Sequence, residues 1–182
     1  MGIFVGEPAP KFKGSAVVGG NAANLNPENA FKEISLDDYK GKWLVFFFYP
    51  ADFTFVCPTE IEEFGKHYEE FKKINTEVLA CSVDSQFSHL AWRQSLPGLM
   101  NLPFPMLADS THQISKDYNV YRESAGHAVR GLFIIDPEGN VRYYVVHPEE
   151  AGRSSAETLR VLQALQTGKM TPCNWEPGTP TL

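Results

Sequence analysis

The sequence WLVFFFY fills residues 43–49 and ends at Pro50. A continuous apolar and aromatic run of this length is typical of a central strand that is covered on both faces. A second segment, Glu77–Val83, also has the character of a strand. Between them, an apolar stripe at helical spacing predicts one helix that reaches about Asn75; its members are Ile61, Phe64, Phe71 and Ile74. Strand, helix and strand in this order favour parallel strands in an α/β domain.

The second half of the chain continues this alternation. A short helix is predicted over Gln86–Gln94, with Phe87, Leu90 and Ala91 facing inward. After a proline-rich loop, a strand is predicted near Met106–Ala108 and a helix over about Ser110–Tyr118. These elements extend the α/β pattern towards the C-terminus.

A hairpin and a capped helix complete the predicted domain. Arg130–Ile135 and Val141–Val146 flank a turn that contains Pro137 and Gly139, which is typical of a β-hairpin. Ser154 and Glu157 form a capping box for a last helix, and Gly168 stands at its expected end. We therefore expect a domain over residues 1–168 and a proline-containing tail over residues 169–182, extended or mobile in isolation.

Composition restricts the function classes. A chain of 182 residues with a net charge of −6 and a pI near 5.4 fits one domain without the basic excess of a nucleic-acid-binding protein. Its longest apolar stretch, Leu44–Tyr49, is far shorter than the roughly 20 residues of a membrane helix. Met1–Pro10 lacks the pattern of an export signal. Three cysteines do not make a closed set of structural disulfides, so we expect a reducing, cytoplasmic location.

The five histidines lack the spacings of a zinc site, so no metal is expected. The candidate for chemistry is Cys57, which follows the strand at the predicted start of the first helix. Unpaired N–H groups and the positive end of the helix dipole favour a thiolate there, and a thiolate is a nucleophile. Thr54 lies one turn earlier and can hydrogen-bond the sulfur or an incoming oxygen, and Pro50 would shield the sulfur from water.

Two other interpretations of Cys57 must be weighed. Most unpaired cysteines are small buried apolar residues, and the spacing of Pro50, Thr54 and Cys57 alone is only moderately specific. A thioredoxin-like disulfide reductase would carry a second cysteine at position 60, where this chain has Glu60. The neighbouring sequence has to decide between packing and catalysis.

That neighbouring sequence is similar to a known family. FTFVCPTEI, residues 53–61, resembles the peroxidatic motif of the typical 2-Cys peroxiredoxins, specifically the AhpC type, the peroxidase component of alkyl hydroperoxide reductase. Further segments resemble family segments in the family's order, and together they span about residues 4–178: SVDS (82–85), HLAW (89–92), RGLFIID (130–136) and GRS (152–154). The resemblance implies a thioredoxin-like fold with a central mixed sheet flanked by helices.

It also implies a peroxide pocket formed by Pro50, Thr54, Cys57 and Arg130. The guanidinium of Arg130 would stabilise negative charge as it moves from sulfur to the leaving oxygen, and Glu60 would orient that guanidinium. Attack on the O–O bond would leave a sulfenic acid on Cys57. A surface salt bridge is the alternative role for Arg130.

The family resolves the sulfenic acid with a second cysteine near the C-terminus, usually from the neighbouring subunit of a homodimer. Cys173 is the candidate here, and Cys81, in the middle of a predicted strand, is interpreted as packing. The commonest family motif places the resolving cysteine where this chain has Thr171. Cys173 lies two residues nearer Trp175, where an actinobacterial branch carries a second cysteine.

The resemblance implies no cofactor in this chain and an external dithiol reductant: thioredoxin, a flavin-containing reductase or a protein of the AhpD type. It further implies a homodimer, assembled into a decamer. The alternative function is a redox-regulated ring-shaped holdase chaperone or a redox relay.

The resemblance also bears on over-oxidation. Members of the family that are sensitive to peroxide carry a Gly-Gly-Leu-Gly loop and a C-terminal helix ending in Tyr-Phe. The corresponding loop here, Ser95–Asn101, reads SLPGLMN, and the sequence given continues only nine residues past Cys173 (182 − 173 = 9). We therefore expect an enzyme that resists over-oxidation.

Overall fold

The computed structural model describes residues 2–182. Met1 lies outside the described residues. Both the predicted domain and the segment Met1–Pro10 begin at this residue. The elements follow one another as β1 (Lys13–Val17), η1 (Ala22–Asn24), β2 (Phe31–Ser35), η2 (Leu36–Tyr39), β3 (Trp43–Phe48), α1 (Cys57–Lys66), α2 (Tyr68–Lys73), β4 (Thr76–Ser82), α3 (Gln86–Ser95), η3 (Pro97–Leu99), β5 (Met106–Ala108), α4 (Gln113–Asp117), β6 (Tyr121–Arg122), β7 (His127–Ala128), β8 (Arg130–Ile135), β9 (Val141–His147) and α5 (Ser155–Gln166).

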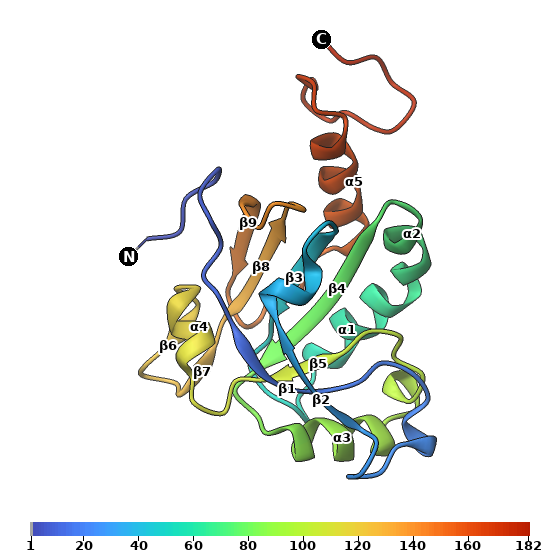
Figure 1. The fold of residues 1–182 in the computed structure, drawn as a ribbon, viewed down its shortest axis with the longest axis vertical. Coiled ribbons are helices and arrows are strands. Elements are labelled where there is room, and N and C mark those ends of the chain that lie inside the picture. Colours follow the sequence, from blue (N-terminus) through green and yellow to red (C-terminus); the bar gives the residue numbers. More distant parts are fainter. Residues whose placement is uncertain (1) are drawn as a thin grey trace.

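Seven of these strands form one mixed sheet in the order β2-β1-β5-β4-β3-β8-β9. The pairs β3–β4 and β4–β5 are parallel, as the strand–helix–strand pattern predicts, whereas β8 is antiparallel to both β3 and β9. The hairpin of β8 and β9 is therefore confirmed. β6 and β7 form a separate small hairpin next to the start of β8 (Figure 1).

β3 is the central strand that its composition predicts, because β4 and β8 flank it and both of its faces are buried. Val45 and Phe47 point to the layer formed by α1, α2, α3 and α5. Phe46 and Phe48 point to the opposite layer, which contains α4 and the N-terminal segment around Phe12. Figure 1 shows these helical layers on opposite sides of the sheet. The alternation of side chains along a strand explains why an uninterrupted apolar run is required here.

The structure corrects the predicted first helix. The apolar stripe does not belong to one helix up to about Asn75, because the chain leaves helical geometry at His67 (φ −87°, ψ 0°) and restarts as α2. The ring Nδ1 of His67 lies 2.9 Å from the Oγ of Ser155 at the start of α5. The break therefore coincides with a contact between α1 and α5, which helical periodicity does not encode.

The inward face of α3 also differs from the prediction. Phe87 and Ala91 are exposed, whereas Leu90 is buried together with His89, Trp92 and Arg93. The prediction considered only apolar residues, but burial of the two polar side chains is compensated by hydrogen bonds. The predicted helix over about Ser110–Tyr118 is real but shorter, Gln113–Asp117.

α5 begins where the capping box predicts, since the Ser154 side chain accepts a hydrogen bond from the N–H of Glu157. The tail after α5 contains no helix or strand among its described residues, yet it is not fully extended. The N–H of Leu182 donates to the carbonyl of Met170 at 2.9 Å, which closes a loop around the buried Trp175. Figure 1 shows this loop beyond the end of α5.

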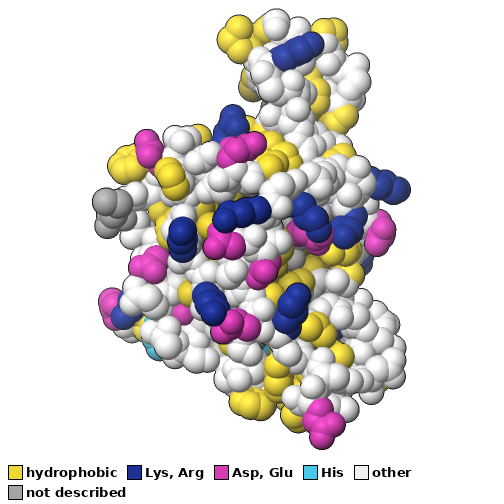
Figure 2. Space-filling view, viewed as in Figure 1, with side chains coloured by type: hydrophobic (Ala, Val, Ile, Leu, Met, Phe, Trp, Pro, Cys, Tyr) yellow, Lys and Arg dark blue, Asp and Glu magenta, His cyan; other side chains and the backbone are white. Residues whose placement is uncertain are grey.

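Charged side chains of both signs are interspersed on the face drawn in Figure 2. This pattern agrees with the absence of a basic excess in the composition. Among the described residues, no helix combines the length and the apolar character needed to cross a membrane.

Candidate active site

Cys57 is the first residue of α1, and Val56 is the N-cap. Pro58 lies in the same first turn, where its missing N–H removes no helical hydrogen bond. The Cys57 side chain is nearly fully buried, with 1% of its surface exposed. The sulfur therefore lies at the positive end of a helix, which favours negative charge on it, and away from bulk water, which opposes that charge.

The loop between β3 and α1 is fixed by Asp52, whose importance the sequence analysis missed. The carboxylate of Asp52 accepts hydrogen bonds from Tyr49 Oη at 2.7 Å and Ser88 Oγ at 2.8 Å, and it lies 2.8 Å from Nδ1 of His89. The N–H of Asp52 donates to Asp84 at 3.0 Å. His89 belongs to the segment HLAW, and Asp52 directly precedes the segment FTFVCPTEI. The resemblance of these segments to the family was therefore the available signal for both residues. This network holds the loop in one conformation ahead of Cys57.

Thr54 and Pro50 lie in this loop. The Thr54 hydroxyl donates to the carbonyl of Ala51 at 2.8 Å, so its proton is already engaged and its oxygen can accept a hydrogen bond. Pro50 is buried directly after β3. Phe53, between them, has a positive φ of 56°, which is uncommon for a residue other than glycine and reflects the sharp path of the loop.

Arg130 is the first residue of β8 and lies beside the end of the neighbouring strand β3. From there its side chain reaches Cys57. Its Nη1 lies 3.5 Å from the sulfur of Cys57 and donates to Oε2 of Glu60 at 2.7 Å. Its Nε donates to the carbonyl oxygen of Glu149 at 2.7 Å. Arg130 is only 3% exposed, so the surface salt bridge considered above is ruled out. These bonds fix the plane of the guanidinium beside the sulfur.

Arg153 is a further site residue that the sequence analysis did not single out, although it quoted the segment that contains it. Its Nε and Nη2 donate to the two oxygens of Glu60 at 2.8 and 3.0 Å, and its backbone N–H donates to Oε1 at 2.7 Å. Glu60 and both arginines are buried. Two guanidinium groups and one carboxylate leave one positive charge, which a Cys57 thiolate would neutralise.

The charge state of Glu60 follows from the same contacts. Burial alone would raise the pKa of this carboxyl, but the hydrogen bonds and charge of Arg153, together with the charge of Arg130, outweigh it. The pKa of Glu60 is therefore held below its ordinary value. Burial lowers the pKa of the Arg153 guanidinium, and Glu60 opposes that effect. The carboxylate is thus ionised and orients both arginines.

Cys173 does not share this pocket. It is exposed and lines a cleft with Arg142 of β9 and the second half of α5, including Arg160 and Leu165. Arg160 Nη1 donates to the carbonyl of Trp175 at 2.7 Å, which holds the tail against α5. Arg153, two residues before α5, donates to Glu60 beside Cys57, and the 12 residues of α5 that follow span about 18 Å. The structure therefore brings together Cys57, Arg130 and Glu60, and places Cys173 elsewhere on the same chain.

Cys81 lies in the middle of β4 and is fully buried. Burial, followed by the charge of Asp109, raises the pKa of its thiol well above the ordinary value. A thiol in this environment is not a nucleophile at neutral pH, and its surroundings are those of a packing residue.

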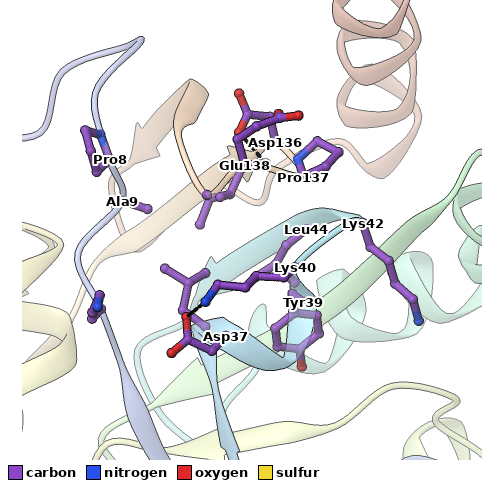
Figure 3. Close-up of a pocket in the computed structure, with 14 residues that line it drawn as sticks. Pro8, Ala9, Asp37, Tyr39, Lys40, Lys42, Leu44, Asp136, Pro137 and Glu138 are labelled. Carbon is purple, nitrogen blue, oxygen red and sulfur yellow. Dashed lines mark hydrogen bonds and ion pairs between the residues drawn. The ribbon is translucent and has the colours of Figure 1, made fainter.

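A separate cavity of about 200 Å³ lies at the start of β3, whereas Cys57 follows the end of this strand (Figure 3). The strand is about 20 Å long, so the cavity and Cys57 are far apart. Leu44, Tyr39 and Pro137 contribute apolar surface, and Lys40 forms an ion pair with Asp37 at 2.8 Å. No cysteine or histidine lines this cavity. The described residues also contain no group of three or more His, Cys, Asp or Glu side chains placed to bind a metal ion. The buried cluster of Cys57, Arg130 and Glu60 therefore remains the candidate active site.

The chain is similar in sequence to known proteins. A model of the AhpC/TSA family matches residues 5–144. Human (Homo sapiens) Peroxiredoxin-4 is 53% identical over 187 residues, which cover 98% of this chain and 65% of that protein. The mitochondrial thioredoxin-dependent peroxide reductase of Mus musculus is 52% identical over 185 residues, which cover 98% of this chain and 68% of that protein. This chain thus spans about 65% of the length of the human relative.

Solved structures show the same fold. Mycobacterium bovis AhpC matches with a TM-score of 0.89 and 37% sequence identity, covering 97% of this chain and 99% of that one. A reduced 2-Cys peroxiredoxin of Plasmodium vivax matches with a TM-score of 0.88 and 38% identity, covering 97% and 91%.

Proposed function

This chain belongs to the AhpC/TSA family, and on that basis we propose that it is a peroxiredoxin, a thiol peroxidase that reduces hydrogen peroxide and organic hydroperoxides. The observation that carries the proposal is the buried contact of 3.5 Å between Nη1 of Arg130 and the sulfur of Cys57. A buried sulfur beside a guanidinium that already pairs with Glu60 has the surroundings of a thiolate nucleophile.

In the first step, the Cys57 thiolate attacks one oxygen of the peroxide O–O bond. A sulfur–oxygen bond forms, the O–O bond breaks, and the other oxygen leaves as hydroxide or alkoxide and takes up a proton. Arg130 stabilises the negative charge that moves from sulfur to the leaving oxygen, and the Thr54 oxygen accepts a hydrogen bond from the peroxide. Pro50 excludes water. The product on the enzyme is the Cys57 sulfenic acid.

In the second step, we propose that the Cys173 thiol of a second subunit attacks this sulfenic acid and releases water as the disulfide forms. The position of Cys173 along α5, away from the Cys57 pocket of its own chain, supports resolution between subunits. β9 is the edge strand of the sheet, and Tyr144 and Val146 on it are exposed. An edge strand with exposed apolar residues supports a homodimer that pairs through β9.

Larger assembly and recycling are further parts of the proposal. Phe53 and Phe87 are 60% and 58% exposed, and such apolar surface supports association of dimers into a decamer. The external dithiol reductant is thioredoxin, a flavin-containing reductase or an AhpD-type protein; a thioredoxin-dependent relative supports the first of these. The proposed cycle needs no cofactor bound to this chain. We propose a cytoplasmic location from the reducing conditions that it requires.

The function is tested by comparing wild type with Cys173→Ser in peroxide consumption driven by a dithiol reductant. We expect the variant to undergo the first oxidation at the wild-type rate but to lose turnover, because its sulfenic acid has no partner. On a non-reducing gel, peroxide-treated wild type should run as a linked dimer and the variant as a monomer. Full turnover by the variant would refute the resolving role, and wild type that stays monomeric would indicate an intrachain disulfide.

Resistance to over-oxidation is a second expected result. The loop that contains η3 contacts α1 in its second turn, where Gly98 packs closely on Glu62. The described tail lies against the second half of α5. Local unwinding around Cys57 should therefore cost less than in the peroxide-sensitive members of the family, and disulfide formation should outrun sulfinic acid formation. Mass spectrometry after turnover in millimolar peroxide should find Cys57 mostly free of sulfinic acid, and predominant sulfinylation would contradict this expectation.

A further inference from the structure

The first oxidation step requires a fixed Arg130, and one of its two anchors lies outside the pocket. Nη1 is held by Glu60, whereas Nε donates to the backbone carbonyl of Glu149, two residues beyond the end of β9. Because the guanidinium is planar, these two anchors together set its orientation towards the sulfur. The position of the Glu149 backbone therefore affects the position of the charge that stabilises the reaction.

The side chain of Glu149 is tied to a different element. Its Oε1 accepts a hydrogen bond from Nη1 of Arg122 at 3.1 Å, and its Oε2 lies 3.8 Å from Nε2 of His127. Arg122 and His127 are paired across the small β6–β7 hairpin, which lies next to the start of β8 (Figure 1). The Glu149 side chain is about one third exposed, so these contacts are only partly screened by water. Glu149 thus links the hairpin to Arg130.

We infer that Glu149 is a positioning residue for the proposed peroxidase reaction, through which the charge of the β6–β7 hairpin controls the orientation of Arg130. The inference rests on the proposed function. Glu149 touches neither the peroxide nor the sulfur; it acts by holding its own carbonyl against Nε of Arg130. Nothing in the catalytic motif around Cys57 indicates this role, because the contact joins residues 19 positions apart.

The inference includes a dependence on pH. The charged or titratable groups that face Glu149 are Arg122 of β6, His127 of β7 and Arg130 of β8. His127 in turn faces Glu149 and its cross-strand neighbour Arg122, and its Nδ1 lies 3.2 Å from the Ala128 carbonyl. Histidine is the side chain whose charge ordinarily changes between pH 5 and 8. A protonated His127 gives Glu149 a second cationic partner, so the anchor is firmer at low pH.

The test measures the rate of the first oxidation of Cys57 by hydrogen peroxide in Glu149→Gln, at pH 6 and pH 8. An exposed ion pair contributes little, so we expect a slowing of about three- to fivefold at pH 6 and less than about twofold at pH 8. Taking the ratio of variant to wild-type rates at each pH removes the titration of Cys57 itself. In a His127→Gln background, the effect of Glu149→Gln should be the same at the two pH values.

The matched control is Glu150→Gln, which alters the neighbouring, more exposed carboxylate and should react like wild type. Arg122→Gln removes the other cationic partner of Glu149 and leaves His127 in place, so it should slow the reaction by less than about twofold. The rate at which iodoacetamide alkylates Cys57 should stay unchanged in every variant. This reaction needs the thiolate, but it breaks no O–O bond and so does not need a precisely oriented Arg130.

Three results would overturn the inference. Glu149→Gln could react with hydrogen peroxide as fast as Glu150→Gln, or its slowing could be the same at both pH values. The third is that the rate of alkylation falls in Glu149→Gln by the same factor as the rate of oxidation. The failure of the proposed function would look different. In that case wild type itself would not react with hydrogen peroxide, whereas failure of the inference alone leaves wild type active.

Discussion

Cys57→Ser is expected to reduce peroxide consumption to the uncatalysed rate. A serine hydroxyl loses its proton far less readily than a thiol, so the first turn of α1 cannot supply an anionic nucleophile after this change. The substitution is nearly isosteric at a buried position, so the fold should persist. Peroxide consumption at a fixed reductant concentration tests the loss of activity, and thermal unfolding of the variant tests whether the fold persists.

The control for this experiment is Cys81→Ala, which removes the other buried thiol and should retain turnover. Substantial turnover by Cys57→Ser would remove Cys57 from its assigned role. The same variant also addresses the alternative function. If it still protects a client protein from aggregation, a holdase activity independent of peroxide chemistry gains support.

Arg130→Ala is expected to slow the first oxidation by about two to three orders of magnitude, the usual effect of losing one well-placed donor to a developing negative charge. The variant keeps Glu60 paired, because Arg153 contacts both of its carboxylate oxygens. No carboxylate is therefore left buried without a partner, and the chain should still fold. Rapid-mixing measurements of Cys57 oxidation give the rate directly.

Two further variants separate charge from geometry. Arg130→Lys restores a positive charge without the planar fork, so it should recover only part of the rate. Arg142→Ala removes an arginine of β9 that pairs with Asp136, away from Cys57, and should leave the rate unchanged. An Arg130→Ala enzyme with the wild-type rate would refute the proposed stabilisation of the leaving oxygen.

The sequence by itself determined the elements whose formation depends on residues close together in the chain. The apolar run at 43–49 predicted the central strand, and the capping box at Ser154 predicted the start of α5 within one residue. The turn at 136–140 predicted the β8–β9 hairpin. The position of Cys57 in the first turn of α1 also followed, because the predicted strand ends before it and the helical stripe begins after it. Caps, turns and periodicity act over a few residues, and local sequence encodes them.

Only the tertiary structure decided the contacts between distant segments. Arg153 joins Glu60 across 93 residues, and Arg130 reaches Cys57 across 73. The break at His67 coincides with a contact to Ser155, and the polar face of α3 is buried through bonds to other segments. The strands β1 and β2 were not predicted; β1 pairs with β2 and also with β5, a partner far along the chain. These features depend on which surfaces meet after the sheet forms, and a local pattern carries no information about a partner that is distant in sequence.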